Sequence, residues 1–326
     1  MTFNRRSVLL GAAIAGAAPM VACGRGGSSG GEALTVGLTF IPNVQFSPFY
    51  VAESEGLFKD AGLNLVIRHH GTQEGLFTAL QTGEEHIVFA SSDEAMVAAA
   101  SDLPGLRTFA TCYQRYPGVL LGSETVTGMK DLAGHSIGVP GGYGSSWFTA
   151  LAALKLAGLK QEDVEVQPIG WTQVAALTTG KTDAVVGFRN NEAVQLTAAG
   201  APFHQIEVID PAAPQLVGPG LVTMAGTVPE TQLKAIVDAV LEADRRIVSD
   251  PELALKATER HVPTLADAEQ RTQATRVLEA TVELWAKPGE QISLGVNVDD
   301  FTRMGEFLTE VGIIRQAPAE PVLMLG

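Results

Sequence analysis

Aromatic side chains of the kind that bind small molecules gather in a few short segments of this chain. All four tyrosines, Tyr50, Tyr113, Tyr116 and Tyr143, lie at or beside loops that follow apolar runs. A tyrosine or tryptophan ring offers a flat apolar face and a polar tip, which suits stacking on an aromatic molecule. Phe46 and Trp147 lie nearby and also fit a second interpretation, in which they only pack helices together.

The same segments hold polar residues, and together the two kinds form a candidate binding site. Such polar residues occur in any solvated loop, so the argument rests on their shared placement in equivalent loops. The candidate contacts are Asn43, Phe46, Ser91, Asp93, Tyr113, Tyr116, Gly142, Tyr143, Gly144, Ser145, Arg189, Asn191 and Glu192.

The glycine-rich loop at residues 141–146 (GGYGSS) indicates binding rather than catalysis. It precedes a predicted helix, where free backbone N–H groups favour an anion or a carbonyl oxygen. The ending of a phosphate-binding P-loop, the dinucleotide fingerprint and a Gly-x-Ser-x-Gly elbow are all missing. His69 and His70 are neighbours on a predicted strand and point to opposite faces, which argues against a shared metal ion. We therefore expect no catalytic residue, cofactor or metal.

An internal repeat shows which elements position these loops. Ala79–Gly83 (ALQTG) recurs 97 residues later as Ala176–Gly180 (ALTTG), and an apolar stretch follows each copy. Each copy also begins with a strand, a loop containing Gly or Pro, a helix and a Gly-Leu turn. Strands that alternate with helices predict βαβ units and parallel sheets. We expect two α/β lobes.

Two connecting segments and a helical tail complete the expected organisation. Thr111–Leu121 and Gly218–Ala225 are interpreted as crossovers between the lobes, and the helices after Pro229 should pack back on the first lobe. Loops at the carboxyl ends of parallel strands line ligand crevices, so a cleft between the lobes follows. The expected units are residues 1–22 (signal peptide), 23–33 (lipid-anchored flexible tether), 34–116 (first part of lobe 1), 117–218 (lobe 2) and 219–326 (completion of lobe 1 and C-terminal helices).

The N-terminal residues are typical of an export signal. Arg5 and Arg6 precede the apolar run Val8–Ala18, and small residues lead to Cys23. A cysteine in this position resembles the lipobox of bacterial lipoproteins, so we expect a lipid anchor at Cys23 on the extracytoplasmic side of the membrane. The alternative is a plain signal peptide with a chance cysteine, and the arginine pair leaves the twin-arginine route open beside the general secretory one.

Composition excludes several classes of protein. The chain has 326 residues, 46% hydrophobic and 18% charged, which is typical of a globular protein with about two domains. A formal net charge of −14 would repel phosphate backbones, so nucleic acid is not an expected partner. Cys23 and Cys112 are too few for a zinc site or a disulfide framework.

Three segments carry a resemblance to a known family. They are Phe40–Ala52 (FIPNVQFSPFYVA), Gly56–Leu63 (GLFKDAGL) and Asn190–Glu192 (NNE). Over residues 34–314 the chain resembles the solute-binding components of ABC importers in the thiamine-pyrimidine-precursor, sulfonate and nitrate group. The resemblance implies a type II periplasmic-binding-protein fold: an α/β, two-lobed protein with two crossover segments and a ligand cleft between the lobes.

The resemblance also implies a function and specific contacts. The expected protein is a monomeric substrate-binding lipoprotein that captures a small aromatic heterocycle, such as a thiamine pyrimidine precursor, and delivers it to an ABC permease with its ATPase. In the pyrimidine-precursor branch the residues that match Asn43 and Glu192 contact ligand, and aromatic rings sandwich the pyrimidine. The rings expected here are Phe40 or Phe46 from one lobe and Tyr116 or Tyr143 from the other.

Three alternatives stay open. Relatives of this branch are linked to riboflavin uptake, which the same flat-ring chemistry would allow. A sulfonate or nitrate receptor would be favoured if Arg115 and Arg189 both faced residues 141–146. Eukaryotic members make the thiamine pyrimidine from pyridoxal phosphate and histidine. That chemistry needs a lysine and, by resemblance, a cysteine-rich segment, neither of which occurs in the cleft loops, so we do not expect an enzyme.

Overall fold

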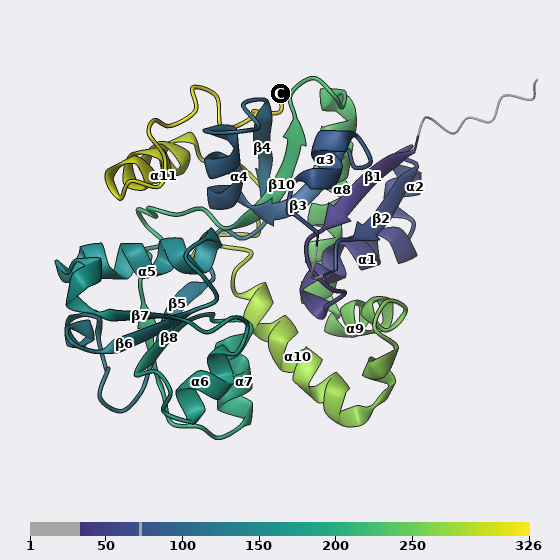
Figure 1. Cartoon of the computed structure of the whole chain (residues 1–326). Coiled ribbons are helices and arrows are strands. Elements are labelled where there is room, and N and C mark those ends of the chain that lie inside the picture. The colour runs from purple at the N-terminus through teal and green to yellow at the C-terminus, as the bar shows by residue number, and fades with distance from the viewer. Residues whose placement is uncertain (1–32, 72–73) are drawn as a thin grey trace, which may run out of the picture.

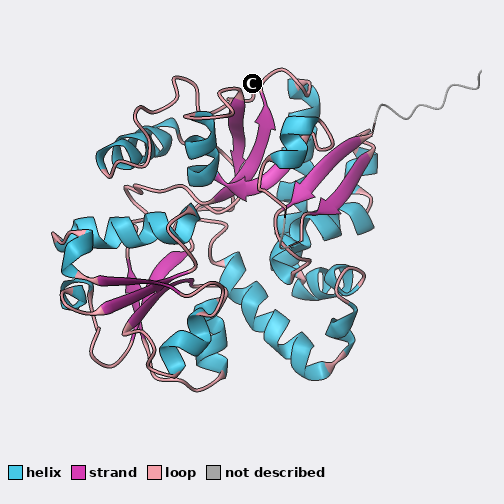
Figure 2. Cartoon of the chain, in the orientation of Figure 1, coloured by secondary structure: helices cyan, strands magenta, loops and turns pink. Residues whose placement is uncertain are grey.

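The computed structural model describes residues 33–71 and 74–326. These residues form two lobes, each a five-stranded sheet covered by helices (Figures 1 and 2). The expected two-lobed α/β fold class is thus confirmed. The predicted signal segment 1–22, the predicted anchor Cys23 and nearly all of the predicted tether lie outside the described residues.

The first sheet has the strand order β2-β1-β3-β10-β4. Strands β1 and β3 lie between other strands and are almost entirely apolar and buried, as strands covered on both faces are. β1 is parallel to β2 and β3, whereas β10 is antiparallel to β3 and β4. The strand bounds are β1 Leu34–Leu38, β2 Leu65–His69, β3 Ile87–Ser91, β4 Leu106–Thr111 and β10 Pro219–Met224.

The second sheet has the strand order β7-β6-β8-β5-β9 and repeats the same plan. β6 is parallel to β7 and β8, whereas β5 is antiparallel to β8 and β9. The strand bounds are β5 Gly118–Gly122, β6 Ser136–Val139, β7 Glu165–Pro168, β8 Ala184–Phe188 and β9 His204–Glu207.

The predicted βαβ units are parallel in both lobes, but each sheet also holds one antiparallel strand, β10 or β5, which the sequence analysis interpreted as part of a crossover. β5 starts at Gly118 opposite Phe188, the last residue of β8, and β10 starts at Pro219 opposite Ser91, the last residue of β3. A chain that crosses between lobes enters each sheet at the carboxyl edge of the parallel strands, so it must run against them. Much of the two predicted crossover segments is consequently strand, and the connections themselves are residues 112–117 and 208–218.

The segment after Pro229 is mostly helical, as predicted. α8 (Glu230–Ser249) begins after Pro229, and its buried residues, which include Leu233, Ile236 and Val240, lie in the core of the first lobe. The other helices are α1 Ser47–Ser54, α2 Leu57–Asp60, α3 Thr78–Thr82, α4 Ser92–Ala99, α5 Gly144–Ala157, α6 Gln173–Thr178, α7 Glu192–Ala198, α9 Pro251–Glu259, α10 Ala268–Val282 and α11 Val298–Glu310. Four 3-10 turns lie at Val44–Phe46 (η1), Met129–Leu132 (η2), Gln161–Asp163 (η3) and Pro263–Ala266 (η4).

The last helix departs from the expectation that the whole tail packs on the first lobe. Phe301, Met304 and Phe307 of α11 are buried in the core cluster that also holds α5 of the second lobe and the second connection. Lys155 of α5 forms an ion pair with Glu310 of α11. α11 therefore ties the chain's end to both lobes near the connections. Within residues 33–71 and 74–326, none of the helices combines the length and apolarity that a membrane span requires.

Candidate functional site

The carboxyl edges of the two sheets lie on the same side of the molecule as both connections. β4 and β9 leave their sheets at this edge, and β5 and β10 enter at it. The loops that follow β1, β3, β6, β7 and β8 therefore converge between the lobes, where ligands bind in open α/β sheets. We call this set of loops the interlobe site.

Two exposed aromatic rings from opposite lobes meet at the interlobe site. Phe40 follows β1 and its residue is 42% exposed, while Trp171 follows β7 and is 68% exposed. Their ring centroids lie 5.8 Å apart with the planes inclined by 49°. Tyr143, after β6, is a third exposed ring. Large apolar rings are normally covered, so an exposed group of them favours a binding surface.

The backbone of Phe40 is strained. Its φ of 79° is the only positive φ of a non-glycine residue in the described part of the chain. Such strain costs about 1–3 kcal/mol and persists only where the surroundings impose it. The Gly71 N–H donates to the Phe40 carbonyl at 3.2 Å, and the Thr39 hydroxyl donates to the Phe89 carbonyl at 2.9 Å. These bonds fix the backbone at Phe40 and the side chain of the residue before it.

The other predicted aromatic residues lie inside the protein. Phe46 packs edge-to-face on Phe89, with centroids 5.6 Å apart, in the core of the first lobe. Tyr113 also packs against Phe89, and Tyr116 is buried in the core cluster of the second lobe. In this structure the packing interpretation holds for Phe46, and of the two expected pairs of rings only Phe40 and Tyr143 are exposed.

Asp93 joins the two lobes through a buried set of hydrogen bonds. It follows Ser91 and Ser92 at the start of α4 and is fully buried. The Tyr116 hydroxyl, from the first connection, donates to Asp93 Oδ2 at 2.7 Å, and the Ser145 hydroxyl, from α5, donates to Asp93 Oδ1 at 2.7 Å. Burial raises the pKa of Asp93. Loss of water around its carboxyl, together with the Asp93 charge, raises the pKa of Glu94 to about 8.

The glycine-rich loop brings the N-terminus of α5 against these carboxyls. Gly144, the first residue of α5, has φ of 71°, and a Cβ there would lie 2.8 Å from Glu94 Oε1. Glycine is thus required both by the left-handed backbone and by the close approach of Glu94. Gly142 and Tyr143 stay exposed beside this contact.

The second-lobe loop after β8 is closed by its own side chains. Glu192 begins α7, and its Oε2 accepts from the Phe188 N–H at 2.8 Å while its Oε1 accepts from Asn191 Nδ2 at 2.9 Å. Burial raises the pKa of Glu192. Arg189 forms an ion pair with Glu207 of β9. Both predicted contacts therefore stabilise their own lobe here.

Asn43 and Asn190 have different surroundings. Asn43 caps η1, its Oδ1 accepting from the Gln45 N–H at 3.1 Å. Asn190 is fully buried and donates to Thr281 of α10 at 3.0 Å, which makes a second polar link from the second lobe to the tail of the first. Among the described residues its Oδ1 has no hydrogen-bond partner.

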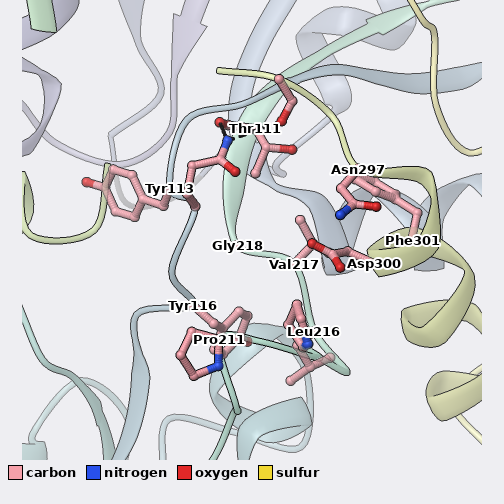
Figure 3. A pocket seen from close by; sticks show the side chains of 13 residues that line it. Thr111, Tyr113, Tyr116, Pro211, Leu216, Val217, Gly218, Asn297, Asp300 and Phe301 are labelled. Carbon is pink, nitrogen blue, oxygen red and sulfur yellow. Dashed lines mark hydrogen bonds between the residues drawn. The ribbon is translucent and has the colours of Figure 1, made fainter. Parts of the chain in front are cut away.

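The first connection is held by hydrogen bonds to the chain between α10 and α11. Gln114 Nε2 donates to the carbonyls of Ser293 at 2.9 Å and Gly295 at 3.1 Å, and the Arg115 N–H donates to the Leu284 carbonyl. The cavity drawn in Figure 3 lies between the two connections and α11 and measures about 20 Å³. That volume holds one water molecule and no heterocycle.

One cluster on the first lobe has the composition of a metal site. His70, Glu74 and Glu85 offer ligand atoms within 4.8 Å of one another. Arg68, however, pairs with both carboxylates at 2.6 Å, so a cation would have to displace a guanidinium group. His69 points elsewhere and contacts the Tyr50 hydroxyl at 2.9 Å, as alternation along a strand requires. We assign no metal ion to this cluster.

Known proteins share both sequence and fold with this chain. Residues 43–254 match the family model described as NMT1/THI5 like. The chain belongs to this family. The solved periplasmic aliphatic sulphonate binding protein SsuA from Escherichia coli shares the fold, with a TM-score of 0.70, 16% identity and coverage of 91% of this chain and 94% of that one. This likeness confirms the expected periplasmic-binding-protein fold.

Two curated relatives match most of the chain. The riboflavin-binding protein RibY of Chloroflexus aurantiacus is 28% identical over 299 residues, covering 89% of this chain and 83% of the relative. The formylaminopyrimidine-binding protein of Halalkalibacterium halodurans is 23% identical over 250 residues, covering 74% of this chain and 76% of the relative. Both names describe binding proteins.

Sequence reasoning missed two residues of the interlobe site, Trp171 and Glu94, and the residue Thr281 that contacts it. Trp171 carried a readable signal, because it follows Gly170 in the loop after a predicted strand. Glu94 was not among the predicted contacts, although it directly follows the predicted contact Asp93. Thr281 had no local signal, since it lies on a tail helix and reaches Asn190 only through the tertiary fold.

Proposed function

We propose that this protein is the extracytoplasmic substrate-binding component of an ABC importer and that it captures a flat aromatic heterocycle between its lobes. The observation that carries the proposal is the contact of Phe40 with Trp171, two exposed rings supplied by opposite lobes. A ring held between them would be stacked on both faces, and the ligand itself would then bridge the lobes.

Riboflavin is the preferred ligand. Its fused rings offer a flat face for stacking on exposed rings such as Phe40 and Trp171, and the relative from Chloroflexus aurantiacus supports the choice. A sandwiched ring needs about 7 Å between the flanking planes, twice a contact distance of about 3.5 Å. The present centroid separation of 5.8 Å is shorter, so the lobes or the rings must move apart to admit it.

An aminopyrimidine is the second candidate, supported by the relative from Halalkalibacterium halodurans. Glu192 could accept hydrogen bonds from the exocyclic amine, and Asn43 could bond the opposite ring edge. Both side chains already have partners in their own lobes, so such a ligand would have to replace those bonds.

The remaining alternatives find less support. An anion site built from Arg115 and Arg189 would need both to face residues 141–146, yet Arg189 pairs with Glu207 and Arg115 reaches the Glu283 carbonyl. For enzyme chemistry, Cys112 is a poor nucleophile because burial raises the pKa of its thiol well above the ordinary value.

We also propose a lipid anchor and boundaries for the two lobes. The mature chain would start at a lipidated Cys23, followed by a tether to residue 33. Residues 34–116 and 219–326 would form lobe 1, apart from α11, which packs on the second lobe, and residues 117–218 would form lobe 2. The partners would be the permease and its ATPase, and the protein would act as a monomer.

Titration of flavin fluorescence tests the proposal. Stacking on Trp171 should quench the fluorescence of riboflavin. Trp171→Ala and Phe40→Ala should each weaken binding at least tenfold, or by about 1.4 kcal/mol. Leu156→Ala is the matched control, since Leu156 is an apolar residue 48% exposed on α5. Calorimetry with 4-amino-5-hydroxymethyl-2-methylpyrimidine tests the second candidate. Binding of either ligand that survives both ring substitutions would refute the stacked site.

A further inference from the structure

Two buried polar clusters join the lobes beside the connections. Each contains the second residue after the middle strand of a sheet, Asp93 after β3 and Asn190 after β8. Each of these side chains bonds a hydroxyl carried by a helix that packs on the opposite lobe. The Ser145 hydroxyl of α5 donates to Asp93 at 2.7 Å, and Asn190 donates to the Thr281 hydroxyl of α10 at 3.0 Å. The lobes therefore meet through a matching pair of hydrogen bonds.

The first connection supplies one tyrosine to each cluster, and the two rings point in different directions (Figure 3). The Tyr116 hydroxyl donates to Asp93 at 2.7 Å and also reaches a carbonyl of α5 at 3.2 Å, so it contacts both lobes. At the other cluster, burial raises the pKa of Tyr113, and the nearby side chains of Asn190 and Thr281 oppose that rise. We call the two groups the Asp93 cluster (Asp93, Tyr116, Ser145) and the Asn190 cluster (Asn190, Tyr113, Thr281).

The bonds of both clusters are shielded from water. Asp93 and Asn190 are fully buried, as is Thr281. The Asp93 N–H also donates to the Val217 carbonyl at 3.1 Å, which attaches the second connection to the same cluster. Breaking a bond here would leave a buried polar group unpaired, so a rotation that keeps the bonds costs less free energy. Movement of the lobes should therefore leave both clusters intact.

We propose that the Asp93 cluster and the Asn190 cluster are the two pivots of the hinge, and that the lobes rotate about the line that joins them. Two fixed points leave one rigid lobe a single rotation relative to the other. By this rotation Phe40 and Trp171 can move apart at the interlobe site while the buried bonds are kept. These pivots do not depend on which ligand binds, so they go beyond the proposed function.

Pulsed electron paramagnetic resonance can test the pivots, because it measures the distribution of distances between two spin labels. Lys59→Cys on α2 and Glu124→Cys after β5 place one label on each lobe, and both positions are exposed. The labels are introduced in a Cys23→Ser form of the full chain. Cys112 stays unlabelled, because it is buried.

Ser145→Ala and Thr281→Val each remove the hydrogen bond between the lobes in one cluster. Each should widen the distribution of distances by about half, because one point no longer constrains the rotation. The double variant should widen the distribution further than either single variant.

Ser136→Ala and Thr258→Val are matched controls, because they remove equivalent bonds inside a single lobe. The Ser136 hydroxyl donates to Asp183 at 2.7 Å within the second lobe. The Thr258 hydroxyl donates at 2.7 Å to the carbonyl four residues earlier on α9, as Thr281 does on α10. Both controls should leave the width of the distribution unchanged.

A mean distance that shifts without widening would show that the removed bond is a latch broken on opening, and would overturn the inference. Unchanged widths in both variants, or equal widening in the controls, would also overturn it. If one variant does not fold, the other decides alone, since each cluster predicts its own effect. Failure of riboflavin to bind would count against the proposed function only, because these distances are measured without added ligand.

Discussion

Replacing Phe40 by glycine and by alanine separates the energy of backbone strain from the contribution of the phenyl ring to stability and ligand binding. At an ordinary helical position glycine is less stable than alanine by about 0.5–1 kcal/mol. At φ of 79° the order should reverse, because a Cβ in the left-handed region costs about 1–2 kcal/mol. The difference between these terms predicts that Phe40→Gly is more stable than Phe40→Ala by about 1 kcal/mol.

Compared with the wild type, the glycine variant should unfold at nearly the same free energy. It gains the relief of strain and loses the contact with Trp171, for which an aromatic pair contributes about 0.5–1.5 kcal/mol. Both variants lose the ring, so both should bind riboflavin at least tenfold more weakly. The strained backbone at Phe40 would then lower stability, and the ring that it carries would be kept for ligand binding.

Urea unfolding of the three proteins measures the free energies, with Leu156→Gly and Leu156→Ala as controls on helix α5. At Leu156 the alanine variant should be the more stable. If alanine is also the more stable at position 40, the strained backbone is not imposed by the fold. If stability falls by several kcal/mol in both variants while affinity is unchanged, Phe40 is a packing residue and the stacked site is wrong.

Three further predictions concern acids and the anchor. Burial raises the pKa of Glu94 from 4.5 to about 8, so the folded protein keeps a proton that the unfolded chain loses. The free energy of unfolding should therefore fall as pH rises from about 4.5 to 8, by at most about 1.4 kcal/mol per pH unit. In urea unfolding at several pH values, Glu94→Gln should flatten this slope. Glu124→Gln, a control at an exposed glutamate, should leave the slope unchanged. Glu192→Gln should lower the free energy of unfolding by about 1 kcal/mol, because the glutamine NH2 group would face the NH2 group of Asn191 and neither could accept. An unchanged melting temperature together with lost affinity would instead favour a ligand contact. Cys23→Ser should release the protein from membranes, and retention after a carbonate wash would refute the anchor.

Much of the architecture could be read from local patterns. The repeat of Ala79–Gly83 at Ala176–Gly180 predicted two similar lobes, and the helices expected after Pro229 begin with α8. These signals are local, because strand alternation and helix periodicity depend on neighbours in the chain. The direction of β5 and β10 was not predicted, since it depends on the edge at which a crossing chain enters a sheet.

The sequence by itself determined the family, the two-lobed fold and the loops that face each other, because each of these follows from short motifs and their order. Tertiary structure decided which side chains in those loops remain available. Phe46 and Tyr116 look as suitable as Phe40 in sequence, yet packing buries them, whereas a strained φ leaves Phe40 exposed opposite Trp171. Burial and pairing of this kind depend on contacts between residues far apart in the chain, and periodicity along the chain carries no information about them.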